Sequence, residues 1–176
     1  VRDMRHFDVR AKRFCERAQA LASTVDEAGW AEVPARVAAY LRQHALPMQL
    51  VCWDEFTELD WSGAGIRAQA RAACGDDLVG LTGACCGIAE TGTLMMLSGA
   101  STPPSVSLLP ETHIAVLSAS RIVRSMEDAW ALLRGAVTGI PRAVSFISGP
   151  SRTADIEQTV TLGAHGPYRV HILITD

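Results

Sequence analysis

Short runs built almost entirely from apolar residues constrain the fold of this chain more than any other feature of its sequence. They include Met48 to Trp53, His113 to Ser118 and Val170 to Thr175. A strand that is apolar on both faces is typical of a parallel sheet covered on both sides. In the C-terminal half these runs alternate with helical patterns. The sequence therefore predicts an α/β fold, a mostly parallel sheet flanked by helices.

The N-terminal part of the chain is predicted to be helical. One helix is expected over Val9 to Ala28, and a second begins near Pro34, a residue suited to a first helical turn. The length of 176 residues suits one domain. We therefore expect residues 1–45 to form a helical N-terminal segment of the same domain as the α/β part, residues 46–176.

Further helices are predicted over Ile66 to Cys74, from Ser125 onward, and over Ala154 to Leu162. Ser125 and Asp128 have the spacing of a helix cap. Gly and Thr punctuate the region between Leu78 and Leu97, which indicates short strands and tight turns.

Composition excludes several classes of protein. Hydrophobic residues make up 48% of the chain and the net charge is −3, with the basic residues dispersed, so neither disorder nor a nucleic-acid-binding stripe is expected. No apolar run has membrane-spanning length, and the N-terminus lacks the pattern of a secretory signal. We expect a cytoplasmic protein.

The five cysteines show no C-x-x-C spacing, so the sequence offers neither an iron–sulfur nor a zinc pattern. Vicinal Cys85 and Cys86 are interpreted as small buried side chains rather than as a redox pair. No histidine has a second one at ligand spacing, and no metal site is expected.

The segment from Thr82 to Thr93 is the first of three candidate functional stretches. Its glycines allow close approach of a ligand to the backbone, and its threonine hydroxyls can bind an oxyanion. Glu90 is either a general base or nucleophile, or a carboxylate that only bonds to neighbouring turn amides. The predicted ligand-binding residues are Thr82, Gly83, Thr91, Gly92 and Thr93.

The second stretch lies between a predicted strand and the predicted helix over Ala154 to Leu162. A helix N-terminus attracts anions, and the Arg152 guanidinium suits a carboxylate or phosphate. The alternative is that Thr153 and Asp155 only cap the helix. The predicted ligand-binding residues here are Gly149, Ser151, Arg152, Thr153 and Asp155.

The third stretch contains His165, between small residues in a turn. It is either a proton-transfer group or a surface histidine held by hydrogen bonds.

Several of these segments resemble the LUD-domain family, and in particular its LutC/YkgG-type lactate-utilisation members. The match covers roughly residues 48–176. It is carried by Thr82–Ala84, Ile88–Thr93, Leu108–Pro110, His113-Ile114, Gly149–Glu157 and Gly163-x-His165-Gly166-Pro167. The resemblance implies a fold like that of the NagB/RpiA/CoA-transferase group. It also implies a part in oxidising L-lactate to pyruvate, beside two iron–sulfur partner proteins (LutA/LutB-like), with no iron–sulfur cluster in this chain.

Three functions remain open from the sequence. In the first, Arg152 holds a small carboxylate or phosphate in a lactate-oxidising complex, Glu90 or His165 moves a proton, and any electron carrier belongs to a partner. In the second, the chain is a non-enzymatic scaffold or regulatory subunit that docks iron–sulfur proteins through its N-terminal helices. In the third, it is a hydrolase or transferase for a CoA- or sugar-phosphate-type ligand.

Overall fold

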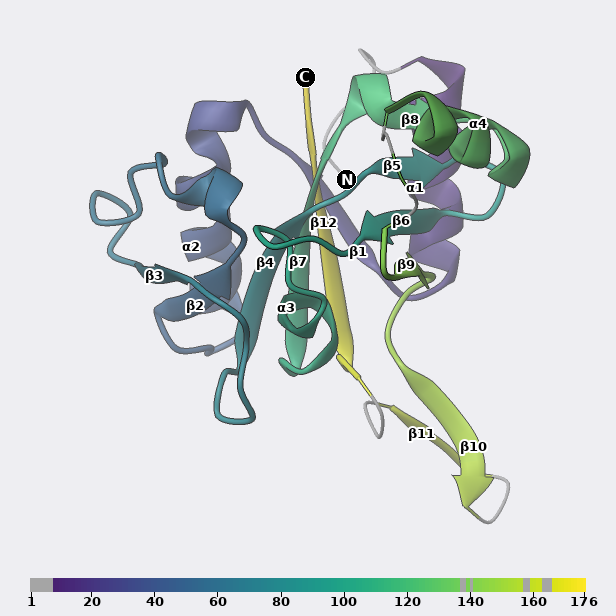
Figure 1. Ribbon diagram of the computed structural model, residues 1–176. Helices are drawn as coiled ribbons and strands as arrows, with labels where there is room; N and C mark the ends of the chain where they lie inside the picture. The colour runs from purple at the N-terminus through teal and green to yellow at the C-terminus, as the bar shows by residue number, and fades with distance from the viewer. Residues whose placement is uncertain (1–7, 137–138, 140, 157–158, 163–165) are drawn as a thin grey trace.

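A six-stranded parallel sheet forms the centre of the computed structural model, which describes residues 8–136, 139, 141–156, 159–162 and 166–176 (Figure 1). All of its strand pairs are parallel. In spatial order the strands are β1 (Thr24–Glu27), β12 (Arg169–Thr175), β7 (Thr112–Ser118), β4 (Val79–Gly83), β2 (Gln49–Cys52) and β3 (Arg67–Ala70). The prediction of a mostly parallel sheet is confirmed.

The strands predicted from apolar runs form the interior of this sheet. β7 and β12 are buried along almost their whole length, because β7 lies between β12 and β4 and helices flank the sheet. The helices are α1 (Val9–Ala20), α2 (Val33–Gln43) and the single turn α3 (Ser105–Leu108). Among the described residues, short 3-10 turns also connect the elements: η1 (Trp30–Glu32), η2 (Asp54–Phe56) and η3 (Ala119–Arg121).

A second, four-stranded sheet lies beside the first. Its order is β8 (Ile122–Val123), β5 (Cys86–Ile88), β6 (Thr93–Leu97) and β9 (Val144–Ile147). Helix α4 (Met126–Ala136) packs on it and buries an apolar cluster that includes Cys86 and Met95. Ser125 and Asp128 exchange hydrogen bonds between side chain and backbone N–H, at 3.4 and 3.3 Å, so the predicted cap is confirmed.

Two predicted helices in the first half of the chain are wrong in extent or type. The first helix ends at Ala20, Ala22 adopts a positive φ, and the following residues form β1. The segment 1–45 therefore contributes a strand to the main sheet. Residues 67–70 form β3, not part of a helix over Ile66 to Cys74, because pairing with β2 outweighs the helical preference of alanine.

The predicted helix over Ala154 to Leu162 is also wrong. This segment belongs to an antiparallel hairpin of β10 (Arg152–Ile156) and β11 (Thr159–Leu162), which projects from the body of the molecule (Figure 1). The sequence TVTL is rich in β-branched residues, which favour strands. Consequently no helix N-terminus is available here to bind an anion.

No helix among the described residues is long and apolar enough to cross a bilayer.

Two glycines of the candidate stretches allow helix α1 to approach the rest of the molecule. Gly92 and Gly149 have positive φ values of 70° and 79°. A Cβ atom on Gly92 would overlap the backbone N of Ala18, and one on Gly149 would overlap the carbonyl oxygen of Leu21. Both positions therefore require glycine for conformation and for space.

We expect Gly149→Ala to lower the free energy of unfolding by more than about 1 kcal/mol, because alanine is strained at positive φ and meets backbone. Gly135, in α4, is the matched control, since a Cβ there meets nothing within 4 Å. Gly135→Ala should stabilise the protein by about 0.5–1 kcal/mol. Urea unfolding measures both, and equal effects of the two substitutions would contradict the packing described for Gly149.

Two buried histidines are held in the neutral form. His113 is fully buried and its Nε2 lies 2.7 Å from the Thr82 hydroxyl, while His171 Nδ1 lies 2.8 Å from that of Thr24. Burial lowers the pKa of each from 6.5 to about 4. For His171, His44 acts in the same direction and Asp26 opposes it. The native state thus binds fewer protons than the unfolded chain below pH 6.5.

We expect full stability above about pH 6.5 and a progressive loss as the pH falls towards 4. Within that window each histidine accounts for up to about 1.4 kcal/mol per pH unit. The urea midpoint measured across this range should fall less steeply in His113→Gln and in His171→Gln. An unchanged slope in both variants would rule out the histidines as its source.

Candidate active site

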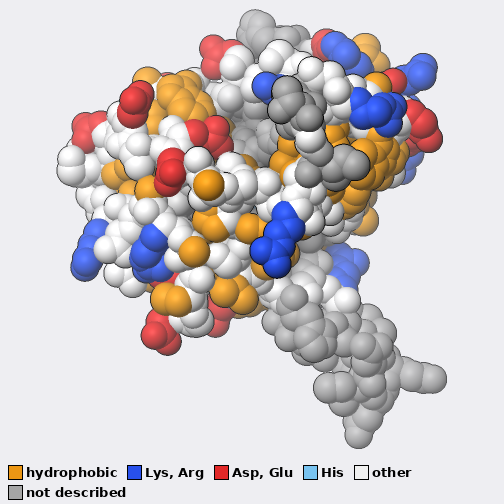
Figure 2. Space-filling view, in the orientation of Figure 1, with side chains coloured by type: hydrophobic (Ala, Val, Ile, Leu, Met, Phe, Trp, Pro, Cys, Tyr) orange, Lys and Arg blue, Asp and Glu red, His pale blue; other side chains and the backbone are white. Residues whose placement is uncertain are grey.

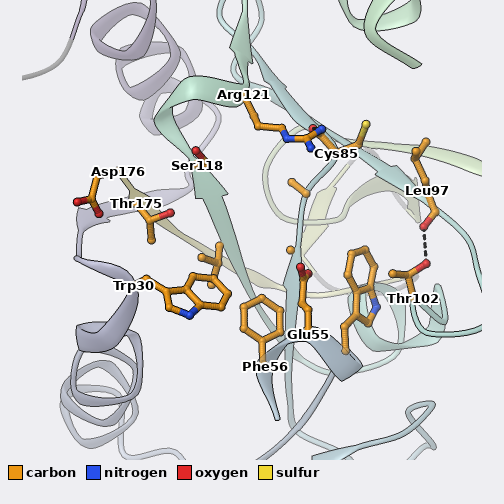
Figure 3. A pocket seen from close by; sticks show the side chains of 14 residues that line it. Trp30, Glu55, Phe56, Cys85, Leu97, Thr102, Ser118, Arg121, Thr175 and Asp176 are labelled. Atoms are coloured by element: carbon orange, nitrogen blue, oxygen red, sulfur yellow. Dashed lines mark hydrogen bonds between the residues drawn. The ribbon is translucent and has the colours of Figure 1, made fainter. Parts of the chain in front are cut away.

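A cavity of about 500 Å³ lies at the carboxyl ends of the parallel strands (Figure 3). Five segments that follow or end these strands line it: Trp30 follows β1, Glu55 follows β2, Cys85 follows β4, Arg121 follows β7, and Thr175 ends β12. Parallel strands in register bring their carboxyl ends to one edge, which is where open α/β sheets bind ligands. The fold thus gathers side chains far apart in the sequence.

Glu55 supplies a carboxylate to this cavity. Figure 3 shows its side chain pointing into the cavity and Arg121 entering from the opposite side. Although part of Glu55 is exposed, burial of the carboxyl raises its pKa, while the backbone N–H of Gly83 and the charge of Arg121 act in the opposite direction. A raised pKa moves a carboxylate towards the range in which it can accept and return a proton.

Gly83 makes room for this carboxylate. A Cβ at Gly83 would occupy the place of Glu55 Oε1. Gly83 was predicted to bind a ligand directly. It lines the cavity, and it also determines where Glu55 can lie.

Cys85 supplies a half-exposed thiol. The neighbouring Cys86 thiol lowers the pKa of Cys85 to about 7; burial opposes this shift and the charge of Arg121 adds to it. An Arg121 N–H also donates to the Cys85 carbonyl oxygen, at 3.4 Å. Cys86 is buried, as the sequence predicts, and its thiol lies 3.8 Å from Met95 Sδ. Cys85, in contrast, faces the cavity.

One side of the cavity is aromatic. Trp30 stacks on the buried Phe56, with ring centroids 5.5 Å apart and planes 28° from parallel. Trp30 remains 45% exposed. Trp53 also lines the cavity, and its indole N–H donates to the Pro103 carbonyl oxygen at 3.2 Å. The site therefore combines an aromatic wall with separate acidic and basic groups.

Most of the first predicted stretch lies away from this cavity. Thr82 is fully buried and bonded to His113, so its hydroxyl faces the core. Glu90, Thr91 and Thr93 lie at the other end of β5 and β6, because the antiparallel pairing sets Ile88 beside Thr93. Cys85, just before β5, and Leu97, the last residue of β6, line the cavity. Gly92 supports α1.

Part of the first stretch lines a separate surface cavity together with Ser148, the residue just before the second stretch, but none of the predicted binding residues of the second stretch, among those the structure describes, lines it. The Thr93 hydroxyl lies 2.7 Å from that of Ser148 and 2.8 Å from that of Thr91. Glu90 and Arg17 line the same cavity of about 520 Å³.

The remaining predicted residues of the second and third stretches are placed as follows. An Arg152 N–H donates to the Leu21 carbonyl oxygen at 3.4 Å, and Ser151 N–H donates to that of Pro167 at 2.8 Å. Thr153 and Asp155 lie in β10, and His165 lies outside the described residues. Arg152 is thus engaged with the end of α1 rather than with the edge of the parallel sheet. No group of three or more metal-ligating side chains gathers within the described part of the chain.

The sequence analysis missed Trp30, Glu55 and Arg121. A signal was nevertheless present for two of them. Glu55 follows the apolar run that ends at Trp53, and Arg121 follows the one that ends at Ser118. Polar residues immediately after a parallel strand are candidates for a site. Trp30 had no comparable signal, because β1 was interpreted as helix.

The comparisons with known proteins agree with one another. The sequence profile of the LUD domain matches residues 11–175. Lactate utilization protein C of Bacillus subtilis (strain 168) is 38% identical over 102 residues, 56% of this chain and 42% of that protein. Lactate utilization protein C of Halalkalibacterium halodurans is 37% identical over 131 residues, which are 73% of this chain and 53% of that protein. An uncharacterised protein of Neisseria meningitidis serogroup B is 43% identical over 94 residues, which are 53% of this chain and 40% of that protein. The chain spans about half the length of these relatives, or less.

One solved structure supports the fold. The crystal structure of a DUF162 family protein from Deinococcus radiodurans aligns with a TM-score of 0.69 at 22% identity, over 96% of this chain and 99% of that chain. This similarity shows a common fold. The profile match covers nearly the whole chain, and so the chain belongs to the LUD-domain family.

Proposed function

We propose that this chain acts in L-lactate utilisation as a cytoplasmic subunit that binds a small 2-hydroxy carboxylate in the cavity at the carboxyl edge of the sheet. The names of its relatives support the pathway. The observation that carries the proposal for the site is the arrangement of Glu55 and Arg121 on opposite sides of one cavity.

The separation of these two charges suits a hydroxy acid. Both side chains line the cavity, yet none of the ion pairs within 4.0 Å among the described residues joins Glu55 to Arg121. In the proposed complex the guanidinium of Arg121 binds the ligand carboxylate and the carboxylate of Glu55 accepts a hydrogen bond from its hydroxyl. Asp176, a further acid at the cavity, also favours placing the ligand carboxylate towards Arg121.

The proposal assigns the iron–sulfur clusters of the pathway to LutA/LutB-like partner proteins. A cluster requires several thiolates grouped closely. Here Cys15, Cys52 and Cys86 are buried, and burial raises the pKa of Cys15 to about 12 and that of Cys52 to about 11. Unpaired thiols are typical of a reducing compartment, which supports the cytoplasm.

We expect Arg121→Ala to abolish growth on L-lactate in a bacterium whose growth on it depends on this chain, because the variant lacks the cation that binds the carboxylate. Arg124→Ala is the matched control, since Arg124 is exposed outside the cavity and its contact with Asp128, at 3.8 Å, is a surface ion pair. Both variants should unfold like the parent in urea. Normal growth of the Arg121→Ala strain on L-lactate would contradict the proposed site.

A second prediction concerns binding without reference to growth. L-lactate or pyruvate should slow alkylation of Cys85 by iodoacetamide, because the ligand covers its thiol in the cavity. Peptide mass spectrometry measures the modification, and the exposed Cys74 provides an internal control whose rate should not change. Equal rates for Cys85 with and without a saturating hydroxy or keto acid would argue against binding here.

A further inference from the structure

The cavity is larger than a small hydroxy acid requires, and one side of it is aromatic. Its volume of about 500 Å³ lies within the range of about 300–1,000 Å³ that holds drug-sized ligands. Lactate bound between Arg121 and Glu55 leaves the side next to Trp30 unfilled (Figure 3). A second group of different chemistry can therefore lie beside it.

Trp30 presents a surface suited to a flat ring. One side of its indole stacks on Phe56, which is completely buried, so the indole is supported from within the protein. Yet 45% of Trp30 is exposed, a large fraction for a tryptophan that lines a cavity. Offset stacking of a second ring on the exposed indole would bury this apolar surface.

Apolar side chains are exposed at several places on the face of the molecule shown in Figure 2. Orange side chains lie around the mouth of a hollow in the upper part of the molecule (Figure 2). Trp30 differs from the other large exposed apolar side chains, such as Val9, Leu109 and Phe146, because it alone of these four lines the cavity that also holds Glu55 and Arg121. The Trp30 indole therefore shares one cavity with the Glu55 carboxylate and the Arg121 guanidinium.

We propose that the Trp30 side of the cavity binds a planar conjugated ring that accepts two electrons, a flavin or quinone head group, next to the hydroxy acid. This inference rests on the proposed function and deepens it. The expectation from the sequence was that any electron carrier belongs to a partner protein. In the present proposal the binding site for the acceptor ring lies in this chain, whether the ring belongs to a free molecule or to a partner protein.

The resulting step balances. The O–H bond of the hydroxy acid breaks and its proton passes to the Glu55 carboxylate. The C–H bond at the same carbon breaks and delivers a hydride, two electrons with one proton, to the ring. A C=O bond forms, which gives the keto acid, and the ring is reduced. The raised pKa of Glu55 is consistent with a group that takes up this proton.

The test uses the purified chain with two probes, flavin mononucleotide and the naphthoquinone menadione, each titrated by isothermal calorimetry. Saturable binding of one probe is expected and identifies the source of the ring. Trp30→Ala should weaken that binding about tenfold, the scale of one lost stacking contact, and Trp30→Phe should weaken it less. Trp130→Phe is the matched control, because Trp130 contacts Phe146 at the second sheet, away from the cavity.

Several outcomes would overturn the inference. Failure of both probes to bind would do so, and so would binding that Trp30→Ala leaves unchanged. The ring and the hydroxy acid should also bind together, so mutual exclusion of the probe and pyruvate counts against it. If no probe binds while pyruvate still protects Cys85, only this inference fails. If pyruvate gives no protection and Arg121→Ala grows normally, the proposed function fails as well.

Discussion

The pairing of β7 with both of its neighbours is the constraint on which the rest of this structure depends. Thr112 pairs with Val79 on one side and Arg169 on the other, and at the far end Val116 pairs with Gly83 and Ser118 with Thr175. Because three parallel strands are aligned in this way, their carboxyl ends meet at one edge. The segments after β4 and β7 then supply the thiol of Cys85 and the guanidinium of Arg121, and those after β2 and β1 supply the carboxylate of Glu55 and the indole of Trp30. A slip of register would separate these groups and expose the apolar faces of the strands.

Three glycines leave the space in which neighbouring groups of the protein lie. Gly92 and Gly149 accept the end of α1 against their backbone, which joins the two glycine-rich stretches to the N-terminal helix. Gly83 accepts the carboxylate of Glu55. In each case the missing Cβ makes a contact possible, but the contacting group belongs to the protein itself. These three glycines of the candidate stretches are thus explained in large part by packing within the chain.

The sequence predicted the strands correctly where burial determines the structure. It failed where pairing with another strand does. Strands β7 and β12 were predicted within about a residue, since few other environments accept residues apolar on both faces. Edge strands β1 and β3 are short and half-exposed, and their patterns fit a helix as well. The hairpin of β10 and β11 was also interpreted as a helix, and with that error the predicted anion site at Arg152 lost its physical basis.

By itself, then, the sequence determined the α/β class, the buried central strands and the family, because hydrophobic patterns and local motifs are properties of neighbouring residues. The tertiary structure alone decided which polar groups meet. Glu55 and Arg121 are far apart in the chain and share no motif, and they come together only because β2, β4 and β7 are parallel neighbours in the sheet. Strand order depends on contacts between distant segments, and no local pattern encodes it.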